Sequence, residues 1–202
     1  VQFNFNAPNI QASGNYSSTG MAVPSAPGTL WAGAEAGVAQ ILNNIKSLLT
    51  RLMNASPEER QAILNSLGLG HLTIKEGIDF AKIIELLGQL NENAINCAVE
   101  ALYNLLGGKV GRAQLAEMAI LVDILTGTLT PEALSQAVSS GQLFLSMYSI
   151  TETARMKGVN LAGYQVADIR AFTGNNLNII AHIRVGGSDT GNHFVVIRSI
   201  TD

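Results

Sequence analysis

The stretch that decides the fold is residues 96–108, which read NCAVEALYNLLGG. Asn96 can cap a helix, the apolar residues that follow recur at helical spacing, and the two glycines can end it. Cys97, the only cysteine of the chain, therefore opens a helix predicted over 97–106. Unpaired backbone N–H groups and the positive end of the helix dipole favour a thiolate there, which is the nucleophilic form.

A histidine stands far downstream, at the mouth of a predicted strand. Residues 191–197 read GNHFVVI, so His193 directly precedes an apolar run. A cysteine at a helix start and a histidine on a later strand form the arrangement that a thiol peptidase needs. The alternative is that Cys97 is a small buried hydrophobe and that His193 only bonds a loop carbonyl.

The composition is that of a globular protein with few charges. The chain has 202 residues, 47% hydrophobic and 13% charged, which suits one good core or a small helical domain beside a catalytic one. A net charge of −3 gives no basic footprint for nucleic acid, and no apolar run reaches membrane-spanning length. The three histidines and one cysteine lack metal-ligand spacing, so we expect no metal and no cofactor. A single cysteine leaves the compartment open.

Three regions follow one another along the chain. Residues 1–30 form an arm rich in Asn, Ser, Gly and Pro, whose alternating start at 1–6 either adds to a sheet edge, its own or a partner's, or is disordered. Residues 31–88 are predicted to be helical. They contain a long amphipathic stretch at 34–54, a capping box at Ser56–Glu59, and a second capping box at Thr73–Glu76 that predicts a helix to Gly88.

From residue 89 onward, helices precede strands. Beyond the Cys97 helix we expect helices at 114–125, from Thr130, and from a cap at Ser149–Glu152 to Gly158. The expected strands are Val159–Val166, Leu177–Val185 and Phe194–Ile200, with the last two joined as an antiparallel hairpin by 186–191. Helices first and a sheet last predict an α+β fold.

From about residue 89 to 202 this order of motifs resembles the papain-like cysteine peptidases that process bacteriocins, the double-glycine leader peptidases. The resemblance rests on the Cys97 helix and on five short motifs: Gln114-Leu115-Ala116-Glu117, Gly127-Thr128-Leu129-Thr130, Met156-Lys157-Gly158-Val159, Asn178–Ile183 and His193-Phe194-Val195-Val196-Ile197. It implies a papain-like peptidase domain at 89–202, preceded by the arm at 1–30 and by an N-terminal helical extension at 31–88 that acts as a pro-region or docking element.

The resemblance also implies the roles of individual residues. Cys97 is the nucleophile, His193 its base, and the side-chain amide of Asn91 or Gln89 completes the oxyanion hole with the backbone N–H of Cys97. The chain departs from the family at Ala98, where the family has glycine, and at Asn91, where it has the longer glutamine. The family's orienting acid lies on a strand well after the histidine, whereas this sequence ends at Asp202.

The implied partner is a peptide or protein substrate. Two other functions stay open: a non-catalytic relative that binds a peptide in the same groove, and a structural subunit that assembles through the arm. Two further histidines receive structural interpretations, His182 as a partly exposed strand residue and His71 as a loop residue. Leu106-Gly107-Gly108 is interpreted as a helix C-cap and not as a cleavage sequence.

The first prediction concerns Asp202. We expect Asp202→Ala to leave the alkylation rate of Cys97 almost unchanged, because Asp202 lies only nine positions past His193, in the turn after its strand. The measurement is the rate of reaction with iodoacetamide. A large loss of rate would identify Asp202 as the orienting acid.

Overall fold

The computed structural model describes residues 35–91, 94, 97–163, 174–184 and 192–200. Seven helices and two strands lie in this part of the chain. In order they are α1 (Glu35–Asn54), α2 (Pro57–Ser66), α3 (Phe80–Leu87), α4 (Cys97–Leu105), α5 (Arg112–Leu125), α6 (Pro131–Ser140), α7 (Met147–Met156), β1 (Gly174–Arg184) and β2 (Asn192–Ile200). The predicted arm at 1–30 and the hairpin loop at 186–191 lie outside the described residues.

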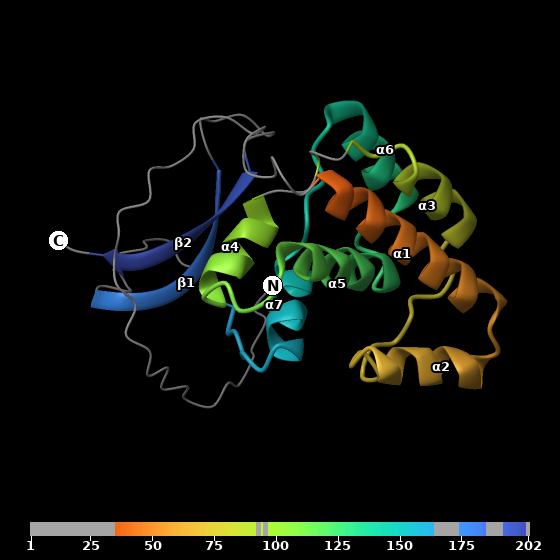
Figure 1. The fold of residues 1–202 in the computed structure, drawn as a ribbon, viewed down its shortest axis with the longest axis horizontal. Coiled ribbons are helices and arrows are strands. Elements are labelled where there is room, and N and C mark those ends of the chain that lie inside the picture. Colours follow the sequence, from red (N-terminus) through yellow and green to blue (C-terminus); the bar gives the residue numbers. More distant parts are fainter. Residues whose placement is uncertain (1–34, 92–93, 95–96, 164–173, 185–191, 201–202) are drawn as a thin grey trace.

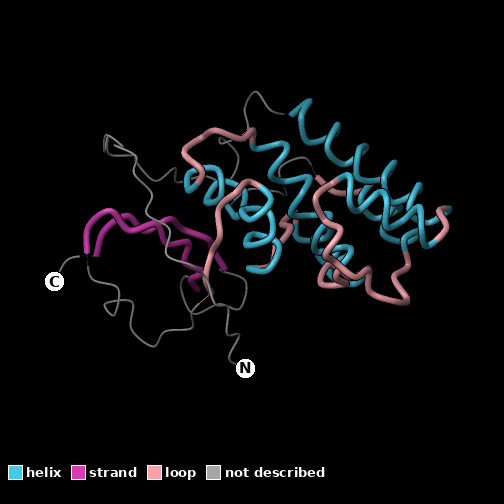
Figure 2. Tube along the Cα trace, turned by 90° about the horizontal axis from the view of Figure 1, so that it is seen from below, coloured by secondary structure: helices cyan, strands magenta, loops and turns pink. Residues whose placement is uncertain are grey.

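The helices form one body, and the sheet lies at one end of it. Figure 1 shows α5 in the middle, with α1 on one side and α4 between α5 and the two strands. Figure 2, from a perpendicular direction, shows the same separation of the strands from most of the helices. The strands pair antiparallel, as predicted, and the fold is helix-rich α+β with a small two-stranded sheet.

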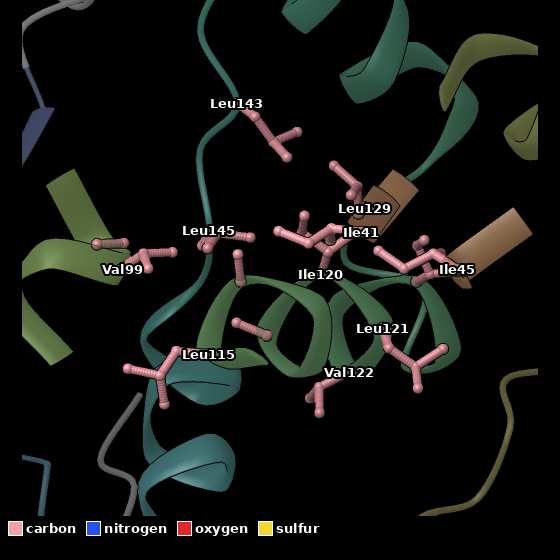
Figure 3. Packing of buried hydrophobic residues seen from close by; sticks show 14 of the residues in the cluster. Ile41, Ile45, Val99, Leu115, Ile120, Leu121, Val122, Leu129, Leu143 and Leu145 are labelled. Carbon is pink, nitrogen blue, oxygen red and sulfur yellow. The ribbon is translucent and has the colours of Figure 1, made fainter. Parts of the chain in front are cut away.

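Helix α5 is buried on almost every side. Nine of its residues are buried, among them Leu115, Ile120 and Ile124, none of which is exposed. In Figure 3, Ile41 and Ile45 of α1 lie toward the part of α5 that carries Ile120 and Leu121, and Val99 of α4 lies toward its Leu115 end. A helix with apolar residues on most of its sides has to be covered on those sides, so α5 fixes the positions of its neighbours.

The helical extension and the helices of the second half share this core. Helix α1 packs on α5 and on α3, and α3 also packs on α6. The buried residues from Val38 to Leu90 belong to the same apolar cluster as those from Leu115 to Ala154. The apolar stripe predicted at 34–54 is therefore buried, against both α3 and α5.

Two predicted helix starts have different outcomes. The capping box at Ser56 and Glu59 is present and opens α2, as predicted. The second capping box is wrong, because no helix begins at Thr73: α3 starts at Phe80 and is capped by the Asp79 side chain. Gly77 has φ +76°, which interrupts a helix, and the backbone N–H of Lys75 donates to the Leu125 carbonyl at 2.9 Å.

The cap predicted at Ser149 is also wrong. Helix α7 begins three residues earlier, at Met147, and Ser146 is its cap. The cause is Asp123, a buried carboxylate on α5 that accepts hydrogen bonds from the Ser146 N–H at 2.8 Å, the Ser146 hydroxyl at 2.5 Å and the Ser149 hydroxyl at 2.9 Å. These bonds fix Ser146 and Ser149 at the start of α7 and so determine where that helix begins.

The predicted strands are confirmed only in the hairpin. Residues 159–163 are not in a strand, so the strand expected at Val159–Val166 is wrong over its described part. The strands expected at Leu177–Val185 and Phe194–Ile200 are present, and each begins earlier than predicted. The pairing slips inside β1: Asn175 faces Ser199 and Ile179 faces Ile197, so three residues of β1 stand opposite Arg198 alone. Such a bulge interrupts the backbone ladder.

The shared core predicts that the extension and the second half unfold together. Ile45→Ala, at a side chain with 0% exposure, is expected to lower the free energy of unfolding by about 2–5 kcal/mol through the cavity it leaves. Met53→Ala, at a 41% exposed position of the same helix, is the control and should change it by less than about 0.5 kcal/mol. Urea unfolding followed by circular dichroism and by exposure of Cys97 should give one shared transition. Two separate transitions would mean two independent domains.

Asp123 predicts a specific pH dependence. Burial raises the pKa of this carboxyl above its ordinary value of 3.8, against the opposing effect of its hydrogen bonds to Ser146 and Ser149. The native state therefore holds the proton more tightly than the unfolded chain, so the group's contribution to stability is greatest below pH 3.8 and is lost as pH rises through the raised pKa.

The matched variant is Asp123→Asn, which cannot ionise. The stability of the unmodified protein relative to this variant is expected to fall as pH rises through that window and then stay constant. Urea unfolding at a series of pH values measures this difference. A difference that grows with pH would show that the hydrogen bonds outweigh burial.

Candidate active site

Cys97 is the first residue of α4, as the sequence predicts. It is half-buried, and the two residues after it, Ala98 and Val99, are buried at 5% and 1% exposure. These side chains hold the first turn of α4 against the core. The other end of the helix is closed by Gly107 and Gly108, both with positive φ, and the Gly108 N–H donates to the Tyr103 carbonyl at 3.0 Å. This geometry supports the interpretation of these glycines as a C-cap.

The sheet packs directly on α4, through both of its strands. One face of the sheet, here called the inner face, makes this contact. Phe194 on it is buried, and Ile180 and Val196 pack on the apolar cluster. Arg198 on the same face donates to the Asn104 carbonyl of α4 at 2.8 Å.

The two strand histidines lie on opposite faces of the sheet. Side chains alternate between the two faces along a strand. Because Phe194 is on the inner face, its neighbour His193 is on the outer face. His193 is exposed and is paired in register with Ile183. His182 is opposite Phe194 in the register and stacks on its ring, with centroids 4.7 Å apart and planes 19° apart. His182 is therefore on the inner face, and it is exposed, in agreement with its interpretation as an exposed strand residue.

Both histidines stand at the Cys97 end of the sheet. The contact between Arg198 and Asn104 joins the far part of β2 to the last turn of α4. Strand β2 therefore runs back along α4, and its first residues lie toward the first turn of the helix (Figure 1). The structure brings Cys97 and the start of β2 to the same end of the α4–sheet interface, and it turns the His193 side chain to the outer face.

The candidate oxyanion residues lie between α3 and α4. The Gln89 amide donates to Glu85 of α3 at 3.5 Å, so this side chain is engaged by its own preceding helix. Asn91 is exposed, and its backbone carbonyl accepts a hydrogen bond from the Ala94 N–H at 2.9 Å in the turn that leads toward Cys97. Asp202, the candidate orienting acid, lies outside the described residues.

A polar cluster on α4 was missed by the sequence reasoning. Glu100, one helical turn after Cys97, accepts two hydrogen bonds from Arg112 of α5, at 2.5 and 2.8 Å. The Arg112 guanidinium also lies 3.5 Å above the centre of the Tyr103 ring, and the bond to Glu100 raises the pKa of Arg112. The one sequence signal for this cluster is the spacing of three residues between Glu100 and Tyr103, which places both side chains on one face of the helix, where a single arginine can contact them.

His71 was assigned to a loop, and the structure gives it a partner. Its Nε2 lies 2.6 Å from Glu152 of α7, and Arg155 contacts the same carboxylate at 3.0 Å. This cluster joins the extension to α7. It is a structural contact on the evidence of its position, and neither α4 nor the sheet contributes to it.

Cavities, metal sites and membrane-spanning helices are the other features that could indicate a function in the described part of the chain. A cavity of about 640 Å³ lies between the loop before α3 and the turn into α6, and no residue of α4 or of the sheet lines it. The described residues include no group of three His, Cys, Asp or Glu side chains that could hold a metal ion. Among the same residues, no helix is both long and apolar enough to cross a membrane.

Comparison with known proteins adds one finding. The model of the Peptidase C39 family matches residues 113–202, from the start of α5 to the end of the sequence. The match includes His193 and begins after Cys97. No curated protein and no solved structure matches the chain. Residues 113–202 are therefore similar to the Peptidase C39 family, in agreement with the resemblance to cysteine peptidases seen in the sequence.

Proposed function

We propose that this protein is a cysteine peptidase in which Cys97 is the nucleophile and His193 the general base. The observation that carries the proposal is the packing of the C39 segment's hairpin on the helix that Cys97 opens, with the start of β2 at the same end as the cysteine. The first residues of β2, which include His193, then lie toward the helix start that Cys97 opens, and a thiol–imidazole pair requires these two groups to be close.

The proposed reaction is acyl transfer to sulfur. His193 takes the thiol proton, the thiolate of Cys97 attacks a peptide carbonyl, and the histidine returns the proton to the leaving amine. Water then hydrolyses the thioester. The backbone N–H of Cys97 and an amide from Asn91 or Gln89 stabilise the oxyanion. Leader-peptide processing at a double-glycine sequence is the finer proposal, and it rests on the family resemblance alone.

One observation favours a second candidate function. His193 lies on the outer face of the sheet, and pairing with Cys97 requires the first residues of β2 to turn toward α4. A domain in which that turn does not occur would bind a peptide without cleaving it, or would serve as a scaffold. The choice between these functions depends on which histidine, if either, affects the thiol.

The extension at 31–88 is proposed to be an integral part of the domain. Release of a pro-region would uncover the face of α5 on which α1 packs, where Ile120, Leu121 and Ile124 are buried. Exposing each of these side chains fully would cost about 1.5–3 kcal/mol, which favours retention of the extension. A docking role on its outer surface remains compatible with this arrangement.

The test compares the two histidines through the reactivity of Cys97. Iodoacetamide is applied at pH 6 and at pH 9.5 to the unmodified protein and to the variants His193→Gln and His182→Gln. A thiolate held by an imidazolium reacts at pH 6, whereas an ordinary thiol reacts only at the higher pH. We expect His193→Gln to lower the pH 6 rate at least about tenfold and His182→Gln to change it less than threefold.

Each other outcome has a definite meaning. A large loss in His182→Gln alone would make His182 the base, in agreement with its position on the inner face. No loss in either variant would contradict the peptidase proposal and favour the scaffold. Cleavage of a peptide that carries Gly-Gly before the scissile bond, abolished by Cys97→Ala, then tests the finer proposal.

A further inference from the structure

We propose that Arg198 is a positioning residue for the pair formed by Cys97 and its histidine. Its guanidinium joins three elements at one point: it belongs to β2, donates to the Asn178 side chain of β1 at 2.6 Å, and donates to the Asn104 carbonyl of α4 at 2.8 Å. The inference rests on the proposed function, because it concerns the alignment of the histidine-bearing sheet with the cysteine-bearing helix.

The place of Arg198 in the sheet explains why a side chain is needed there. Residues 176–178 of β1 stand opposite Arg198 alone, so the backbone ladder is interrupted at this position. A bulge loosens pairing and increases local twist. The bond from Arg198 to Asn178 connects the two strands across the interruption, and it does so from the inner face.

The acceptor on α4 suits a cation. Asn104 is in the last turn of α4, where helix carbonyls lack partners within the helix and the dipole is negative. The same carbonyl also accepts the Gly107 N–H at 3.2 Å, so Arg198 adds a second, charged donor. The planar guanidinium reaches both acceptors at once, which a single ammonium cannot do in the same geometry.

Helix α4 is itself fixed independently of the sheet. The Asn104 side chain donates to Glu100 at 3.2 Å, and Glu100 is held by the two bonds from Arg112 of α5. The polar contacts therefore run from β1 through β2 and α4 to the central helix. The sheet is therefore aligned against a helix that is itself fixed to α5.

Arg198 adds a polar contact to the apolar packing of the sheet on α4 through Phe194, Val196 and Ile180. Buried Phe194 anchors the start of β2 near the Cys97 end, and Arg198 anchors the strand four residues further on, about 13 Å away at the rise of a strand. Without Arg198, only the apolar contacts of Phe194, Val196 and Ile180 would fix the angle between the sheet and α4. A change in that angle moves His182 and His193 relative to Cys97, and a shift of about 1 Å can cost on the order of 100-fold in rate.

The experiment uses the pH dependence of Cys97 alkylation in the full chain, with iodoacetamide as the probe. Arg198→Ala is expected to lower the rate at pH 6 about tenfold, short of the ~100-fold limit because Phe194 stays in place, and to leave the rate at pH 9.5 within twofold. Arg198→Lys should recover part of the loss. Arg51→Ala, at an exposed arginine of α1, is the control and should match the unmodified protein.

Asn178→Ala keeps the test valid if Arg198→Ala does not fold. It removes one of the two bonds and leaves the Asn104 contact, so its loss at pH 6 should be smaller than that of Arg198→Ala and larger than that of Arg51→Ala. An Arg198→Ala protein with an unchanged ratio of rates at the two pH values would overturn the inference. So would an equal loss at both, which marks a merely structural role.

The histidine variants separate failure of the inference from failure of the proposed function. If His193→Gln or His182→Gln lowers the pH 6 rate and the Arg198 and Asn178 variants do not, the peptidase proposal stands and the positioning role is wrong. If neither histidine affects that rate, the thiol has no imidazole partner, and the proposed function and the positioning role fail together.

Discussion

The burial of α5 on almost every side is the constraint on which the rest of the structure depends. The apolar sides of α5 need neighbours, and four helices supply them directly or through one another: α1, α3, α4 and α7. The one ionisable group buried on α5, Asp123, is satisfied by Ser146 and Ser149. The carboxylate at the centre of the core thereby decides where α7 begins.

The candidate catalytic elements are attached to this core in two steps. Helix α4 packs on α5 through its buried residues and is pinned by Glu100 and Arg112. The hairpin then packs on the outer side of α4, through Phe194 and Val196. Its main contacts with the helices are those with α4 and not with α5. The position of the hairpin relative to the core therefore depends on how precisely α4 is held on α5. This arrangement explains why polar contacts at both ends of α4 accompany the apolar packing.

The helical extension changes how the C39 segment should be understood. Residues 113–202 match the family, yet the segment's first helix is covered by α1, which precedes it by more than fifty residues. Cys97 also lies before the matched segment. Helices α1, α3 and α4 therefore complete a core that the matched segment does not close by itself, and both parts contribute to the candidate site.

The sequence by itself determined the elements whose signals are local. The capping box at Ser56, the Thr130–Pro131 start of α6, the Cys97 helix with its closing glycines and the terminal hairpin all depend on neighbouring residues, and each was predicted. Tertiary structure decided the rest. No helix begins at Thr73, because Gly77 interrupts it and the Lys75 N–H bonds to the Leu125 carbonyl instead. Helix α7 does not begin at Ser149, because the Ser149 hydroxyl bonds to Asp123, twenty-six residues away in the chain. The sequence could not predict on which face of the sheet each histidine lies. Alternation along a strand fixes only which side chains share a face, and the packing of Phe194 against the core decides which face turns inward.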